Sequence, residues 1–178
     1  MTRLVPALAT VAVLALAGAA QAQPAPPPAC ATPEFRALDF WAGDWDLDFD
    51  ASPGALGHAT NHITKDEYGP CVIAEHFSLP ATQYVGGSYS IYDPAAKLWR
   101  QTWVDNQGGV FVLTGGPVQG QPYVFELRTT EPVGPKHVIM RMIWEKADAD
   151  RLTWRWQAQQ ADGSWKDSWV LRYARHKA

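Results

Sequence analysis

The chain has 178 residues, of which 47% are hydrophobic and 19% are charged, and its formal net charge is −3. That length suits a single domain preceded by a leader, because domains typically run to about 100–150 residues. A mildly acidic chain without a cluster of Lys and Arg is not expected to have a nucleic-acid partner or to bind an anionic membrane surface.

The first 22 residues have the layout of a secretory signal peptide. Arg3 supplies a short basic region, residues 4–17 are mostly apolar, and Ala20-Gln21-Ala22 is a small-x-small cleavage site. The apolar run is shorter than the roughly 20 residues that a membrane span needs, and no second apolar span follows. We therefore predict cleavage near Ala22 rather than an uncleaved anchor. The mature protein is expected to be periplasmic or secreted, without stable membrane insertion.

Residues 23–32 are predicted to form an extended linker, because prolines dominate the segment QPAPPPA. Cys30 and Cys71 are the two cysteines of the chain. An even number of cysteines in an oxidising compartment favours a disulfide, which would attach the N-terminal segment to the domain. The alternative is a pair of unpaired thiols.

The domain is predicted to span residues 33–178 and to begin with a short helix. Thr32-Pro33-Glu34 combines a capping hydroxyl, a proline at the first helical position and an acid in the first turn. Phe35, Leu38 and Trp41 then recur at a spacing of three. We expect one short helix from Pro33 to Trp41 that packs its apolar stripe on the rest of the domain.

After Gly43 the chain alternates between apolar and polar residues, which is the pattern of half-buried strands. Turn residues such as Asp162-Gly163 interrupt this pattern about every ten residues, as in an antiparallel sandwich or barrel. We predict an all-β, antiparallel, up-and-down β-barrel of 8–10 strands with the short N-terminal helix. After a first strand with Trp45, Leu47 and Phe49, the expected strands are 57–65, 71–78, 87–92, 97–104, 109–114, 123–129, 137–145, 152–159 and 165–174.

The chain has 9 tryptophans, and all of them lie in the predicted domain. Trp99 and Trp103 share one strand face, with Gln101 between them. Such aromatic side chains either line a ligand pocket or fill the core of a small barrel. The sequence leaves both readings open.

Charged residues interrupt apolar strand faces at two places. Glu75 shares a face with Ile73 and Phe77, and Arg141 lies between Ile139 and Ile143 on its face. If these faces point inward, the two charges must pair or bind a polar ligand, because unpaired buried charges are costly. If they point outward, the residues are ordinary solvated positions. The predicted ligand-binding set is Glu75, Trp99, Gln101, Trp103 and Arg141.

No motif in the sequence predicts catalysis, a metal or another cofactor. His58 and His62 share a strand face, and His76 lies on the next predicted strand, a pattern that is typical of surface histidines. The aspartates at 44, 46, 48 and 50 lack the turn glycine and distal glutamate of a calcium loop. We interpret them as the solvated face of a strand.

Gly43-Asp44-Trp45, placed after the short helix, resembles the G-x-W opening of the calycin barrels, which include lipocalins and fatty-acid-binding proteins. In lipocalins this tryptophan closes the barrel floor, and an arginine of the last strand stacks on it. The resemblance therefore implies barrel closure by Trp45 with Arg172 or Arg175.

A longer resemblance, to exported bacterial lipocalin-like domains of unknown function, spans residues 35 to 175. Its motifs are FWAGDW at 40–45, IYDP at 91–94, WRQTWVD at 99–105, DGSW at 162–165 and YAR at 173–175. The preferred function is non-catalytic binding of a small apolar or amphipathic ligand. The alternatives are a barrel enzyme acting on a small hydrophobic or sugar-like substrate, with Glu75 as acid or base, and a structural envelope protein with a filled core.

Overall fold

A computed structural model describes residues 30–65, 67–129 and 138–177. The predicted signal peptide and most of the predicted linker lie outside these residues. Within them, no helix is long and apolar enough to cross a membrane.

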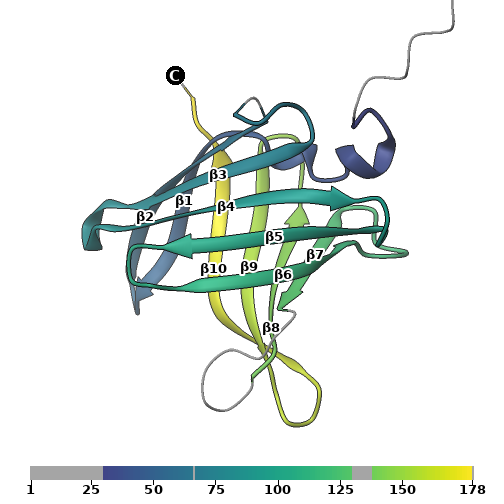
Figure 1. The fold of residues 1–178 in the computed structure, drawn as a ribbon. Helices are drawn as coiled ribbons and strands as arrows, with labels where there is room; N and C mark the ends of the chain where they lie inside the picture. The colour runs from purple at the N-terminus through teal and green to yellow at the C-terminus, as the bar shows by residue number, and fades with distance from the viewer. Residues whose placement is uncertain (1–29, 66, 130–137, 178) are drawn as a thin grey trace, which may run out of the picture.

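Ten antiparallel strands close into a barrel in which each strand pairs with its neighbours in sequence, and β1 pairs with β10 (Figure 1). The predicted up-and-down barrel is therefore confirmed, with ten strands. They are β1 (Gly43–Ser52), β2 (Ala55–Thr64), β3 (Val72–Leu79), β4 (Tyr84–Asp93), β5 (Leu98–Asp105), β6 (Val110–Pro117), β7 (Val124–Thr129), β8 (Met140–Lys146), β9 (Arg151–Gln159) and β10 (Trp165–Arg175).

Alternation decides which side chains fill the barrel, as β1 illustrates. Trp45 and Leu47 are buried inside it, and the aspartates between them point outward. Those aspartates are not merely solvated, because each has a partner on a neighbouring element. The pairs are Asp44 with His62, Asp46 with His176, Asp48 with His58, and Asp50 with Arg172.

The segment before β1 is helical, as predicted, but its form is two 3₁₀ turns. They are η1 (Pro33–Arg36) and η2 (Asp39–Trp41), and a third, η3 (Pro80–Thr82), joins β3 to β4. A 3₁₀ helix has three residues per turn, so side chains spaced by three lie on one side of it. The spacing of Phe35, Leu38 and Trp41 matches that repeat, and Leu38 and Trp41 are fully buried.

This N-terminal segment covers the end of the barrel at which β1 begins and β10 ends (Figure 1). Cys30 and Cys71 are joined by a disulfide, as predicted, with 5.2 Å between their Cα atoms. Because Cys71 directly precedes β3, the bond ties the start of the segment to the same end of the barrel. We call this end the floor.

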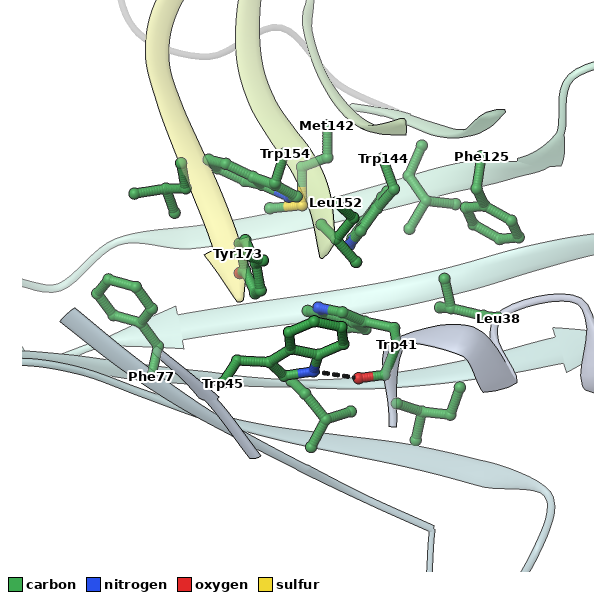
Figure 2. Close-up of a cluster of buried hydrophobic side chains, with 14 of the residues drawn as sticks. Leu38, Trp41, Trp45, Phe77, Phe125, Met142, Trp144, Leu152, Trp154 and Tyr173 are labelled. Carbon is green, nitrogen blue, oxygen red and sulfur yellow. Dashed lines mark hydrogen bonds between the residues drawn. The ribbon is translucent and has the colours of Figure 1, made fainter. Parts of the chain in front are cut away.

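The floor half of the interior is filled with aromatic and aliphatic side chains, among them Leu38, Trp41, Trp45, Phe125 and Trp144 (Figure 2). Trp41 and Trp144 meet edge to face with 5.2 Å between ring centres, and Phe125 meets Trp144 in the same way at 5.7 Å. Trp45 donates a hydrogen bond of 2.7 Å from Nε1 to the carbonyl of Trp41. The filled-barrel reading is therefore correct for this half of the interior.

Candidate functional site

The other half of the interior contains a cavity of about 80 Å³, or about 500 Å³ of empty space when the part open to solvent is included. Eight of the eleven residues that line it are aromatic. The lining consists of Glu75, Phe77, Tyr84, Trp103, Phe111, Met142, Trp154, Trp156, Trp169, Leu171 and Tyr173. A concave, mostly aromatic site with a few polar groups is the usual form of a small-molecule pocket.

Three tryptophans of β9 and β10 form one wall of this cavity. The rings of Trp154 and Trp156 are parallel within 5°, with 6.5 Å between their centres. Trp169 stands edge-on to Trp154 at 6.1 Å and to Phe77 at 5.7 Å. Edge-to-face pairs at such distances are favourable because the ring edge is positive and the ring face negative.

A glycine makes room for the opposite wall. A Cβ atom at Gly86 would lie 2.3 Å from the ring of Trp103, so only glycine lets that ring lie against β4. Trp103 is then fixed by a 3.1 Å hydrogen bond from Nε1 to Asp105, which also accepts a 3.0 Å hydrogen bond from the Tyr84 hydroxyl. Asp105 therefore holds the side chains of Trp103 and Tyr84 in place on this wall of the cavity.

Glu75 is the acidic side chain of the cavity, and neutral groups from three other strands surround it. The hydroxyl of Ser88 donates to its Oε2 at 2.6 Å, and Nδ2 of Asn61 donates to its Oε1 at 2.7 Å. Asn61 Nδ2 also lies 3.0 Å from the hydroxyl of Tyr173. Oδ1 of Asn61 is buried without a hydrogen-bond partner among the described residues. Asn61 therefore has an unused hydrogen-bond acceptor next to the cavity.

Burial raises the pKa of Glu75 to about 7, although the hydrogen bonds from Ser88 and Asn61 and the field of His76 favour the ionised form. Burial also raises the pKa of Tyr173, with a further contribution from Glu75. Tyr173 is thus neutral at physiological pH, whereas Glu75 is present in both charge states.

We expect the free energy of unfolding to change with pH as Glu75 titrates. Between pH 4.5, the reference pKa of the carboxyl, and pH 7, the folded protein binds more protons at Glu75 than the unfolded chain. The stabilisation that proton binding at Glu75 gives the folded protein is therefore fully present below pH 4.5 and is lost as the pH rises to 7. The loss should reach about 3 kcal/mol. Urea unfolding of the wild type and Glu75→Gln should give similar stabilities near pH 4, with the variant more stable at pH 8. Parallel pH profiles for the two proteins would contradict the raised pKa.

Of the five predicted ligand-binding residues, two line the cavity and three lie elsewhere. Glu75 and Trp103 line the cavity. Trp99 and Gln101 are buried inside the barrel but belong to the solid part. Trp99 donates to the carbonyl of Glu34 in η1 at 3.1 Å, and Gln101 Nε2 donates to the hydroxyl of Ser90 at 2.9 Å.

Arg141 does not join Glu75, because it lies on the outer surface of the barrel. Met142 and Trp144, on the other face of β8, are the buried residues of that strand. Arg141 forms an ion pair with Glu126, donates a 2.7 Å hydrogen bond to Gln157, and lies 4.2 Å from the ring centre of Trp165. For Arg141 the outward alternative is therefore the correct one, and it does not share a pocket with Glu75.

The two arginines considered for barrel closure also separate. The guanidinium of Arg175 lies 3.8 Å from the ring centre of Trp45 and donates to the carbonyls of Phe40 and Ala42. Arg172 points outward and pairs with Asp50 at 3.0 Å. The arrangement implied by the lipocalin resemblance is present at Trp45 and Arg175, whereas Arg172 has no part in it.

Several residues that line the cavity or contact Glu75 beside it were not predicted from the sequence. Asn61 interrupts the apolar face of Ala59 and Ile63 in the same way that Glu75 interrupts its own face, so the same signal could have found it. Ser88 and Tyr84 carry no such signal. Among the described residues, no group of three or more His, Cys, Asp or Glu side chains could hold a metal ion.

The crystal structure of Rv2717c from M. tuberculosis is similar, with a TM-score of 0.53 and 14% sequence identity over 82% of this chain and 99% of that one. At this identity the likeness shows the fold alone. No curated protein matches the chain in sequence. Residues 31–175, which include the whole barrel and both 3₁₀ turns before it, match the family described as "Protein of unknown function (DUF1579)". The chain therefore belongs to the DUF1579 family.

Proposed function

We propose that the protein binds a small, partly apolar ligand in the cavity at the open end of its barrel. The observation that carries the proposal is a space of about 80 Å³ enclosed by aromatic rings, with one carboxyl group and a tyrosine hydroxyl at its inner end. Apolar walls supply affinity through burial, and a few placed polar groups supply orientation. The solid floor beneath would keep the ligand in the outer half.

The nine tryptophans provide a test with an internal control. Four line the cavity, at positions 103, 154, 156 and 169, and four are packed in the floor half, at positions 41, 45, 99 and 144. In protein labelled with 5-fluorotryptophan, a ligand in the cavity should shift the ¹⁹F signals of the first four and leave those of the second four unchanged. Arg141→Ala should leave these shifts unaltered, because Arg141 lies outside the barrel.

The ligand itself can be sought by native mass spectrometry of protein purified from its native source. We expect an added mass, and the extracted molecule should shift the cavity signals when it is returned to ligand-free protein. If the purified protein carries no added mass and neither its extract nor small neutral probes such as toluene or indole shift these signals, the binding function is wrong.

We also propose that the protein acts outside the cytoplasm, after cleavage near Ala22. The Cys30–Cys71 disulfide supports this, because such bonds persist in oxidising compartments. The same mass measurement reads the N-terminus, which is expected at Gln23 within two residues. An intact Met1 on protein recovered outside the cytoplasm would contradict the cleavage.

A second candidate function is that of a barrel enzyme with Glu75 as acid or base. It is favoured by the pKa of about 7, because a general acid or base works best when its pKa is near the operating pH. An enzyme would return its bound molecule chemically changed after incubation, and Glu75→Gln would return it intact. A binding protein would return it unchanged in both cases.

A further inference from the structure

The cavity combines two features that single out one class of ligand. The first is a set of aromatic rings from at least five strands around one space, including the tryptophans at 103, 154, 156 and 169. The negative faces of such rings attract cations, and tryptophan does so most strongly. Aromatic cages of this kind are how proteins hold methylated ammonium groups.

The second feature is a buried carboxyl group without a cation. Glu75 receives hydrogen bonds from Ser88 and Asn61, which are neutral. No Lys, Arg or His is among the described residues that line the cavity. A buried carboxylate is costly unless an opposite charge lies next to it.

The two arginines that the sequence suggested for the barrel interior and its floor are committed elsewhere. Arg141 pairs with Glu126 on the outer surface, and the guanidinium of Arg175 lies against the ring of Trp45 in the floor. Neither supplies the missing positive charge, so the place beside Glu75 that faces the cavity is open to a charge brought by the ligand.

We infer that the cavity binds a compact organic cation, such as a methylated or protonated amine, with its positive charge against Glu75 and its alkyl groups against the surrounding rings. This inference rests on the proposed binding function and names its ligand class. An anion of the same shape is disfavoured by Glu75, and a neutral molecule of that shape gains only the contacts with the rings.

Three probes of nearly the same shape separate charge from apolar contact. They are choline, its neutral carbon analogue 3,3-dimethylbutan-1-ol, and the anion 3,3-dimethylbutanoate. With the ¹⁹F signals of the cavity tryptophans as the readout at pH 8, the Kd of choline should be at least about tenfold lower than that of the alcohol. The carboxylate should leave the signals unchanged.

Glu75→Gln removes the charge and keeps the shape of the side chain. In this variant the preference for choline over the alcohol should fall to about threefold or less, and the Kd of the alcohol should stay within about twofold of the wild-type value. Glu126→Gln is the matched control, because that carboxylate lies outside the cavity, and it should keep the full preference. Unchanged floor signals verify that each variant is folded.

The pH profile gives an independent readout. The affinity for choline should rise as the pH goes from 6 to 8, because the cation binds to ionised Glu75, while the affinity for the alcohol stays flat. The other titratable groups near Glu75 are Tyr84 and Tyr173, whose pKa values burial raises, and His76 on the outer face of the same strand. His76→Asn should keep the rise, and Glu75→Gln should abolish it.

The outcomes separate the inference from the function on which it rests. If the alcohol or a neutral aromatic probe shifts the cavity signals as strongly as choline or more so, the cation inference is overturned and the binding function stands. If choline is preferred but Glu75→Gln keeps the preference, Glu75 is not its partner and the inference is likewise overturned. If no probe and no extract from the native source shifts these signals, the binding function fails as well.

Discussion

Replacing Trp45 with alanine is expected to lower the free energy of unfolding by about 3–5 kcal/mol, the usual cost of removing a large buried aromatic side chain. Trp45 is only 2% exposed, meets Tyr173 edge to face, and lies under the guanidinium of Arg175. The substitution also removes the hydrogen bond to the carbonyl of Trp41, which fixes η2 to the floor. Urea or guanidinium unfolding followed by circular dichroism measures the loss.

The matched control is Tyr123→Ala, because the side chain of Tyr123 is 66% exposed. Its effect should stay within about 0.5 kcal/mol, as for most surface substitutions. A loss below about 1 kcal/mol for Trp45→Ala would mean that the floor is closed by other contacts.

Removing the disulfide by the double substitution Cys30→Ser and Cys71→Ser is expected to cost about 4 kcal/mol. The two cysteines are 41 residues apart, and the cross-link restricts the unfolded chain over that loop. The loop contains the N-terminal segment together with β1 and β2, so its release also loosens the cover of the floor. Denaturant unfolding of the oxidised wild type and the double variant measures the difference.

Reductant supplies the control for this comparison. It should lower the stability of the wild type to that of the double variant and leave the variant unchanged. A wild-type protein whose unfolding midpoint does not respond to full reduction of the bond would contradict the expected effect.

The fold could be predicted from the sequence because both of its signals are local. Alternation marks each strand wherever one face is buried, and turn residues mark where each strand ends. The helical segment at 33–41 was predicted in place, although it consists of two 3₁₀ turns rather than one helix. Leu38 and Trp41 are buried against strands that lie far away in the sequence.

The candidate site could be predicted only in part, as Glu75 and Arg141 illustrate. Both interrupt apolar positions, but the two faces of β3 differ, whereas the segment 139–144 has apolar residues on both faces. Ile139, beside Arg141, is 41% exposed, while Met142 and Trp144 fill the interior. Periodicity alone cannot decide which face of such a strand points inward.

A bulge in β10 likewise prevents alternation alone from predicting which tryptophans of this strand point inward. Simple alternation places Trp165 and Trp169 on one face, since they are four residues apart. The register shifts between Asp167 and Trp169, so that Trp169 enters the cavity and Trp165 lies over Arg141 outside. A bulge of this kind depends on pairing with β9, which no local pattern in the sequence encodes.

The pairing of β1 with β10 makes the order of synthesis important for this protein. Trp45 pairs in register with Arg175, so the barrel stays open until the segment up to residue 175 has left the ribosome. Before that point, β1 and the latest strand are unpaired edges, which are templates for aggregation. Contacts that span so much of the sequence also form slowly. A truncation that removes only the last strand would therefore leave an edge along the full length of the barrel.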